Sequence, residues 1–318
     1  MKVTVVGAGG NVGATVALAV AQRDYASEVI LVDLERKEGD KTFYPSVGRA
    51  LDQWQTSPIF GFDTRLRGAT NYDDTANSDI CVITAGVPRR PGMSRDDLLS
   101  INANIVKTVT EQLVAKSPNT IIIVVSNPLD VMTYVAYAAS KLPANKVMGM
   151  AGILDTARYR AFLAEELQVS PKDIQALLLG GHGDTMVPLP RYTTVSGIPV
   201  TQLISKEKLD AIVERAKVGG GELVGLMGTS AWYAPGAAAA QMVEAIALDQ
   251  NRIFPCAAWL TGQYGIKDLY LGVPVKLGKG GIKEIIEVEL DANEKTLLES
   301  SAAAVRSGVE DLKRLQSA

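Results

Sequence analysis

Residue types suited to acid–base chemistry lie around the only histidine of the chain, in the run Gly180-Gly181-His182-Gly183-Asp184. Histidine is the side chain whose ordinary pKa lies closest to neutrality, so an imidazole between glycines suits proton transfer better than core packing. Upstream, Asp155 and Arg158 stand three residues apart, which makes them neighbours if this stretch is helical. A carboxylate beside an imidazole orients the ring and favours its protonated form. We therefore expect His182 and Asp155 to form an acid–base pair.

Three arginines follow a predicted strand, in the run Gly-Val-Pro-Arg89-Arg90-Pro-Gly-Met-Ser-Arg95. The prolines and glycines favour a loop with hinge points, which suits a lid. Guanidinium groups bind carboxylates through paired hydrogen bonds, and Arg158 could supply a second clamp from another element. The chemistry indicated is hydride transfer at a hydroxyl-bearing carbon of a carboxylate substrate. The alternative interpretation is a solvated charged loop.

A dinucleotide-binding pattern lies at the N-terminus. The apolar run Lys2–Val6 leads into Gly7-Ala8-Gly9-Gly10-Asn11-Val12-Gly13, an alanine-rich helical pattern and a second apolar run that ends at Asp33. Glycines allow the main chain to approach a pyrophosphate at a helix N-terminus, and the acid binds the ribose hydroxyls. The spacing is G-x-x-G-x-x-G rather than the common G-x-G-x-x-G. Because a carboxylate at Asp33 would repel a 2′-phosphate, the pattern favours NAD over NADP.

Continuous apolar runs at 78–86 and 120–127 alternate with helical patterns at 94–116 and 130–141. This alternation predicts buried parallel strands with helices on both faces, and places functional residues such as Asn127 at the carboxyl ends of strands. After about residue 145 the rhythm changes. The later patterns predict helices at 155–167, 206–227, 230–250 and from 291, and strands at 173–183, 252–259, 271–276 and 282–290.

We therefore predict an α/β chain with a Rossmann-type doubly wound parallel sheet followed by an α+β substrate domain. The predicted boundary separates residues 1–147, the NAD-binding domain, from residues 148–318, the catalytic domain.

The composition is that of ordinary globular material. The chain has 318 residues, of which 47% are hydrophobic and 21% charged, with a formal charge of −3 and a pI near 5.4. This balance gives no basic footprint for nucleic acid or an anionic membrane. Cys81 and Cys256 lie in apolar runs without metal-ligand spacing, and no apolar run has the length of a membrane span. We expect a cytoplasmic protein without a metal site.

The motifs together resemble the lactate/malate dehydrogenase family, most closely its lactate-dehydrogenase-like malate dehydrogenases, over essentially the whole chain. The resemblance implies that His182 is the proton donor and acceptor and Asp155 its partner. It also implies that Arg158 binds the C1 carboxylate of the substrate, that Arg95 polarises the reacting carbonyl, and that Asn127 contacts substrate and nicotinamide. The segments that carry the resemblance are the glycine turn with Asp33, Pro88–Arg95, Val-Ser-Asn127-Pro, Leu-Asp155-Thr-Ala-Arg158 and Gly-Gly-His182-Gly-Asp.

Further implications concern specificity, cofactor and assembly. Asn102 and Val125 match family positions that line the NAD site, and Arg89 stands where the family distinguishes malate from lactate. Closing a lid over Arg89 without a second carboxylate would bury an unpaired charge, which favours malate and oxaloacetate over lactate and pyruvate. The family also implies a homo-oligomer, with a tetramer favoured over a dimer, and a place in the tricarboxylic acid cycle. Residues about 34–47, which include Arg36 and Lys37, look inserted relative to the family.

Three alternatives remain open. Tyr137 and Lys141 have the Tyr-x-x-x-Lys spacing of short-chain dehydrogenases, although the glycine turn of that class is missing. A non-catalytic NAD sensor could use the same fold, because a fold alone does not give a function. A lactate dehydrogenase is the nearest alternative within the family.

Overall fold

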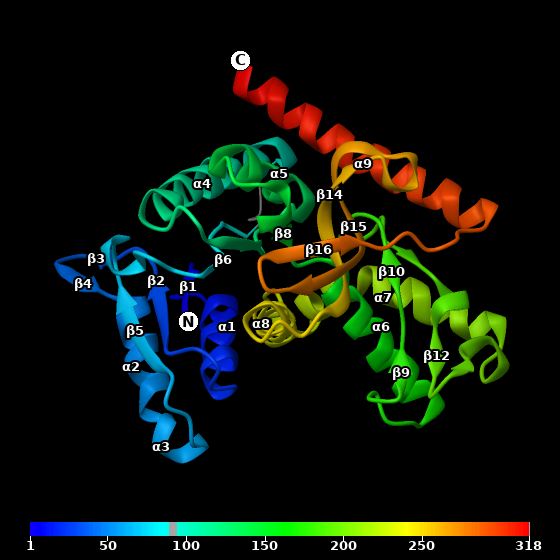
Figure 1. Ribbon diagram of the computed structural model, residues 1–318, viewed down its shortest axis with the longest axis horizontal. Coiled ribbons are helices and arrows are strands. Elements are labelled where there is room, and N and C mark those ends of the chain that lie inside the picture. The colour runs from blue at the N-terminus through cyan, green and yellow to red at the C-terminus, as the bar shows by residue number, and fades with distance from the viewer. Residues whose placement is uncertain (89–93, 318) are drawn as a thin grey trace.

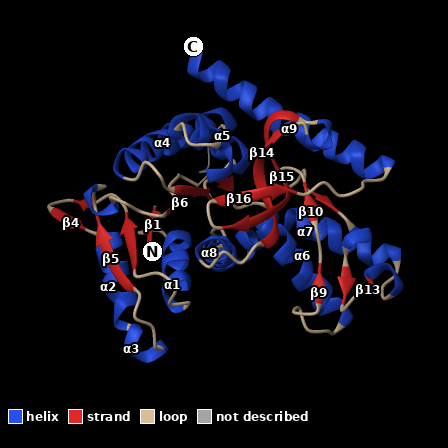
Figure 2. Ribbon diagram, viewed as in Figure 1, coloured by secondary structure: helices blue, strands red, loops and turns tan. Residues whose placement is uncertain are grey.

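The computed structural model describes residues 1–88 and 94–317, and Arg95 only in its main chain. Within these residues the chain forms one nine-stranded sheet with helices on both faces, and three small sheets (Figures 1 and 2). The predicted class, α/β with a Rossmann-type doubly wound parallel sheet followed by an α+β domain, is confirmed.

Six parallel strands make up the first part of the large sheet, in the spatial order β5-β2-β1-β6-β7-β8. Most are short runs of buried β-branched residues, as expected for strands that helices cover on both faces. The strand order reverses between β1 and β6, and ligands of doubly wound sheets bind at such a switch point. The strands are β1 (Lys2–Val6), β2 (Glu28–Val32), β5 (Arg65–Ala69), β6 (Ile80–Ile83), β7 (Ile121–Val124) and β8 (Val147–Gly149).

Helices cover both faces of this sheet. Helices α4, α5 and α9 pack together on one face, and α1 and α8 pack together on the other (Figure 1). The described helices are α1 (Asn11–Gln22), α2 (Pro45–Gln55), α3 (Ser57–Phe60), α4 (Arg95–Lys116), α5 (Leu129–Ser140), α6 (Gly152–Leu167), α7 (Lys206–Met227), α8 (Tyr233–Ala247) and α9 (Ala292–Ser317). None of the helices in the described part of the chain is long and apolar enough to cross a membrane.

The second half extends the large sheet with three antiparallel strands, and β14 joins β8 where Ala257 lies opposite Gly149. The small sheets bring together β3 with β4, β9 with β12 and β13, and β10 with β11. The bounds of these strands are β3 (Arg36–Glu38), β4 (Lys41–Phe43), β9 (Ile174–Gln175), β10 (Leu178–Leu179), β11 (Val187–Pro188), β12 (Thr194–Val195), β13 (Ile198–Pro199), β14 (Arg252–Thr261), β15 (Lys267–Gly278) and β16 (Gly281–Ile285).

Two strand predictions in the second half are wrong in extent. The stretch at 173–183 divides into β9 and β10, and β10 ends at Leu179 because the next residue, Gly180, has a left-handed φ of +87° and forms only an isolated bridge with Gly272. The strand predicted at 282–290 ends at Ile285. The segment at about 34–47, which looks inserted relative to the family, contains the hairpin of β3 and β4.

The main apolar core runs through both halves of the chain, from the parallel strands to β14, β15, α8 and α9. Helix α8 buries its small residues, and Gly236 lies so close to α1 that a Cβ there would be 2.6 Å from Thr15 Cβ. A second, smaller core joins α6 and α7 to the sheet of β9 and β12, around Tyr159 and Leu163. This second core fixes the helix that carries Asp155.

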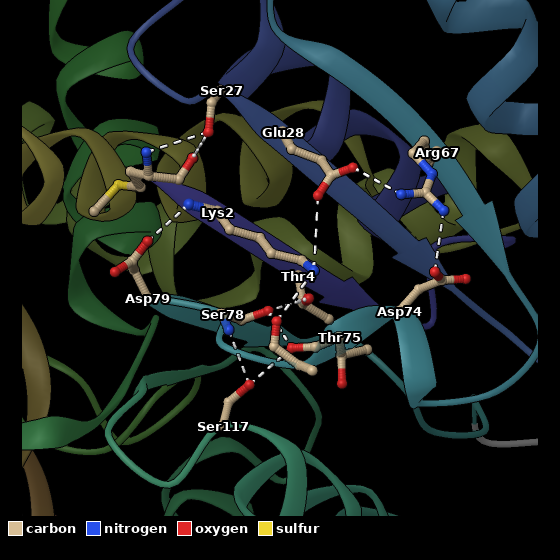
Figure 3. Close-up of polar contacts among 12 residues, drawn as sticks. Lys2, Thr4, Ser27, Glu28, Arg67, Asp74, Thr75, Ser78, Asp79 and Ser117 are labelled. Atoms are coloured by element: carbon tan, nitrogen blue, oxygen red, sulfur yellow. Dashed lines mark hydrogen bonds and ion pairs between the residues drawn. The ribbon is translucent and has the colours of Figure 1, made fainter.

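Polar side chains pair with one another at the amino edge of the parallel strands (Figure 3). Glu28 on β2 lies 3.1 Å from Arg67 Nη1 and 3.7 Å from Lys2 Nζ, and the hydroxyls of Thr4 and Ser78 are 2.7 Å apart. These side chains form ion pairs and hydrogen bonds with one another at the edge of the sheet opposite the glycine turn. The carboxyl edge is therefore where the chain presents its polar groups to a ligand.

A matched pair of glycine substitutions tests the packing of α2 on the sheet. A Cβ on Gly68 of β5 would lie 2.3 Å from Val47 Cα, whereas a Cβ on Gly48, one residue further along α2, meets nothing within 4 Å. We expect Gly68→Ala to cost about 1–3 kcal/mol through overpacking and Gly48→Ala to stabilise the helix by up to about 1 kcal/mol. Thermal unfolding followed by circular dichroism measures both. Equal unfolding temperatures for the two variants would contradict this packing.

Candidate functional site

The carboxylate of Asp155 joins the imidazole of His182 to the guanidinium of Arg158. Asp155 and Arg158 lie in the first turns of α6, and Asp155 is 1% exposed. Its Oδ2 is 2.8 Å from His182 Nδ1, and its Oδ1 accepts a hydrogen bond of 3.3 Å from Arg158 Nη1. When the Nδ1–H group donates a hydrogen bond to Asp155, Nε2 on the other side of the ring remains available to exchange a proton with a ligand. The predicted contact of these three residues is therefore present.

The surroundings of His182 favour the protonated imidazole. Burial alone would lower the pKa of His182, but the charge of Asp155 and its hydrogen bond outweigh burial, so the pKa is raised. The nearby charge of Arg158 opposes this effect. The imidazolium consequently persists to a higher pH than it does for a free histidine.

Three other elements hold the loop that carries His182. Gly180 exchanges two main-chain hydrogen bonds with Gly272 of β15, at 2.9 and 3.1 Å. The next two amides donate to side chains: Gly181 N–H to Ser301 Oγ of α9 at 2.8 Å, and His182 N–H to Asp130 Oδ2 of α5 at 3.0 Å. The position of the imidazole thus depends on α5, α9 and β15 as well as on α6.

Helix α7 passes close to the guanidinium of Arg158. A Cβ on Gly219 would lie 2.3 Å from Arg158 Cδ and 2.9 Å from its Nε. The absence of a side chain at Gly219 therefore lets Arg158 lie between α6 and α7. No such constraint applies to the following residue, because a Cβ on Gly220 meets nothing within 4 Å.

Both halves of the chain line a cleft of about 800 Å³ at the carboxyl edge of the parallel strands. Its lining includes the glycine turn, the end of β2, the end of β6, one face of α4, and Thr229, Ser230, Ala231 and Trp232 from the second half. The residues predicted to bind the cofactor in the glycine turn and at the end of β2, namely Gly7, Gly10, Gly13 and Asp33, all line this cleft.

The glycine turn fits a dinucleotide pyrophosphate. Gly7 has a φ of +84°, and a Cβ on it would lie 2.7 Å from Ala85 N. A Cβ on Gly13 would lie 2.7 Å from Ala8 Cα, so both positions tolerate only glycine. The carboxylate of Asp33 accepts the N–H groups of Gly9 and Leu34, each at 2.8 Å, which fixes it at the end of β2. The main chain can therefore approach a bound phosphate at the N-terminus of α1, with an acid nearby for the ribose.

Asn102, Val125 and Asn127 are not among the described residues that line the cleft. The side chain of Asn102 connects the segments that follow β6 and β7. Its Oδ1 accepts Val87 N–H at 2.8 Å, and its Nδ2 donates to Val87 C=O at 3.2 Å and to Asn127 C=O at 2.8 Å. Val125 is buried. Asn102 thus ties the segment after β6 to the segment after β7.

Two predicted arginines fall outside what the structure describes. Arg89 lies outside the described residues, and so does the side chain of Arg95. The main chain of Arg95 begins α4, where Ser94 Oγ accepts Asp97 N–H at 3.0 Å and the Asp97 carboxylate accepts Ser94 N–H at 3.2 Å. This capping box fixes where the helix starts.

Tyr137, the basis of the short-chain dehydrogenase alternative, packs within an aromatic cluster. Its ring centroid lies 5.2 Å from that of Trp259 and 5.7 Å from that of Tyr270. Tyr137 is not among the described residues lining the cleft. Core packing therefore accounts for this residue.

Sequence reasoning missed three residues that touch the site. Asp130 and Ser301 reach the His182 loop from 52 and 120 residues away, and nothing in a local pattern signals contacts of that range. Gly219 stands in the run Gly219-Gly220-Gly221, which is unusual within a predicted helix. That run is the one signal that the sequence offered.

Comparisons with known proteins agree with this geometry. The family model for the lactate/malate dehydrogenase NAD-binding domain matches residues 1–149, and the model for the α/β C-terminal domain of that family matches residues 153–316. A malate dehydrogenase of Salinibacter ruber is 64% identical over 99% of this chain and 98% of its own length.

Solved structures give the same result. The structure of malate dehydrogenase from Salinibacter ruber has a TM-score of 0.94 at 61% identity, and the match covers 100% of this chain and 99% of that one. A malate dehydrogenase from Plasmodium falciparum, solved in complex with NADH, has a TM-score of 0.90 at 34% identity, with 99% of each chain covered.

Proposed function

Because the chain belongs to the lactate/malate dehydrogenase family, we infer that it is an NAD-dependent malate dehydrogenase. This oxidoreductase interconverts (S)-malate and NAD⁺ with oxaloacetate, NADH and a proton. The observation that carries the mechanism is the buried carboxylate of Asp155, which contacts both His182 and Arg158. Its substrate is a dicarboxylate, as the name of its relatives implies.

His182 is the proton carrier in this proposal. In malate oxidation the neutral imidazole takes the hydroxyl proton as the C–H hydride leaves, and in oxaloacetate reduction the imidazolium returns that proton to the forming alkoxide. NAD, when bound, supplies the hydride acceptor. Asp155 holds the ring by its Nδ1 and stabilises the charge that develops on it.

Arginines bind and polarise the substrate. Arg158 takes the C1 carboxylate, and its contact with Asp155 fixes the guanidinium in place. Arg95 polarises the carbonyl and Arg89 binds the second carboxylate, while Asn127 contacts substrate and nicotinamide. The proposal for Arg89, Arg95 and Asn127 rests on the sequence motifs.

The proposed NAD contacts are Gly7, Gly10, Gly13, Asp33, Asn102, Val125 and Asn127. Asp33 favours NAD over NADP, because its negative carboxylate would repel the 2′-phosphate of NADP. The cations of the following hairpin have partners of their own, since Arg36 lies 3.1 Å from Glu38 and Lys37 lies 3.3 Å from Glu35.

Three wider features complete the proposal. The NAD-binding domain is placed at residues 1–147 and the catalytic domain at 148–318. A homo-oligomer, preferably a tetramer, is supported by exposed apolar side chains on α2, α3 and α7, including Leu51, Ile59 and Leu226. A cytoplasmic location and a role in the tricarboxylic acid cycle are proposed with it. The buried free thiols of Cys81 and Cys256 fit a reducing compartment.

Steady-state rates test the function. We expect oxaloacetate with NADH to be the preferred pair among oxaloacetate or pyruvate with NADH or NADPH. His182→Asn should lower kcat/KM roughly 10²- to 10⁴-fold with NADH binding retained, because the proton carrier is lost. Tyr137→Phe is the control and should change turnover little. The reverse pattern would favour the short-chain dehydrogenase mechanism, and NADH binding without turnover of oxaloacetate would favour a sensor.

Arg89→Gln tests the discrimination between substrates. Pyruvate has no second carboxylate to pair with Arg89, so binding pyruvate would bury an unpaired guanidinium. The substitution removes that cost. We expect the oxaloacetate/pyruvate ratio of kcat/KM to fall by roughly 10²-fold. An unchanged ratio would assign the discrimination to another residue.

Gly219→Ala tests the placement of Arg158 by α7. The new methyl group must displace the guanidinium, so we expect KM for oxaloacetate to rise roughly tenfold, equivalent to about 1.4 kcal/mol, with a smaller change in kcat. Gly220→Ala is the matched control, because it makes the same change in the same helix without touching Arg158. Equal KM values for the two variants would contradict this role of Gly219.

A further inference from the structure

Asp130 is a buried carboxylate whose contacts use only part of its bonding capacity. It lies in the first turn of α5 and is 6% exposed. Its Oδ2 accepts the main-chain N–H of His182 at 3.0 Å, while its Oδ1 is buried and has no hydrogen-bond partner among the described residues. Burying a carboxylate costs far more than burying a neutral acceptor. Anchoring one main-chain N–H does not by itself account for this choice of residue.

The neighbouring amide provides an internal comparison. Gly181 N–H donates to Ser301 Oγ at 2.8 Å, and Ser301 is buried as Asp130 is. A neutral hydroxyl therefore suffices to hold the loop one residue before the histidine. The property that distinguishes Asp130 from Ser301 is its charge.

The charges that face the imidazole come from two helices. Asp155 and Arg158 lie on α6, and Asp130 lies on α5, while Ser301 of α9 and Gly272 of β15 contribute no charge. Because Arg158 lies 3.3 Å from Asp155, it balances part of the negative charge of that carboxylate. Asp130 therefore supplies negative charge that no cation among these neighbours offsets by direct contact.

We propose that Asp130 is a positioning residue for His182 that fixes its main chain and, by its buried negative charge, favours the protonated ring. The proposal deepens the malate dehydrogenase assignment and rests on His182 being the proton carrier. In oxaloacetate reduction the imidazolium loses its proton to the alkoxide, and in malate oxidation the neutral ring gains it from the hydroxyl. Asp130 stabilises the protonated ring in both directions.

The titration of Asp130 itself is consistent with this role. Burial raises the pKa of Asp130 to about 6, and the hydrogen bond from His182 N–H together with the imidazole charge opposes the rise. The main-chain hydrogen bond and the imidazole charge favour the charged carboxylate, so the protonation of Asp130 and that of the ring are coupled.

The pH dependence of Asp130→Asn tests the proposal. Reduction of oxaloacetate requires the imidazolium, so kcat/KM falls as the pH rises through the pKa of His182. Without the negative charge this midpoint should move down by about 0.5–1 pH unit, which lowers the rate roughly 3- to 10-fold above the midpoint and little below it. NADH affinity should not change.

Ser301→Ala is the matched control, because it removes the support of the neighbouring amide without removing a charge. We expect it to lower the rate by the same factor at every pH and to leave the midpoint in place. An unmoved midpoint in Asp130→Asn, or a uniform loss like that of Ser301→Ala, overturns the proposal.

Nuclear magnetic resonance gives a measurement that does not depend on activity or on the folding of a variant. Because His182 is the only histidine, its ring signals are unambiguous in the unliganded wild-type enzyme. We expect these signals to show the titration of the ring and a second inflection at lower pH from Asp130. A single inflection across the whole pH range in which the enzyme stays folded overturns the proposal. Failure of the wild-type enzyme to reduce oxaloacetate would instead overturn the function, and the ring titration would still report on Asp130.

Discussion

One buried carboxylate joins the imidazole of His182 to the guanidinium of Arg158. Asp155 has almost no contact with solvent, and its two oxygens are divided between an imidazole and a guanidinium. Removing one partner of such a buried group leaves an uncompensated charge, at a cost of about 3–5 kcal/mol. The charge state of His182 and the position of Arg158 are consequently linked through a single side chain. The proposed proton carrier and the proposed carboxylate-binding arginine therefore cannot be repositioned independently.

The elements around this carboxylate make the arrangement rigid. Helix α6 lies against α7, with the smaller apolar core beneath it, and the loop of the histidine is tied to three further elements. A proton carrier contributes most when its geometry is set before the substrate arrives. Here the main-chain hydrogen bonds of Gly180 with Gly272, and the close packing of Gly219 against Arg158, fix the geometry in advance.

The sequence predicted those features that depend on runs of apolar residues or on chemically distinctive residue types. Continuous apolar runs predicted β1, β2, β6 and β7, because strands covered on both faces leave no polar side of their own. No such run predicted β5, which carries exposed arginines, or β8, which has only three residues. The residue types in Asp155, Arg158 and His182 also predicted that these side chains meet, and the glycine turn with Asp33 lies in the cleft at the carboxyl edge. These features are local in the chain or follow from a family pattern.

The features that escaped prediction depend on tertiary contacts or on main-chain geometry. The run at 173–183 looked like one strand, because apolar composition carries no information on the positive φ at Gly180. The β3–β4 hairpin is exposed throughout, so it has no alternation of buried and exposed residues to signal a strand. An acid in the first turn of a helix such as Asp130 is ordinary by sequence alone, and only the fold brings it to His182.

The shared sheet has a consequence for how such a chain can be divided. The nine strands continue from the cofactor half into the substrate half where Gly149 meets Ala257, and α8 of the second half shields the apolar side of α1. A fragment ending near residue 149 would expose both a strand margin and an uncovered helix face, which invites self-association. Separating the NAD-binding portion from the second half would therefore require other side chains to cover the edge of β8 and the apolar side of α1.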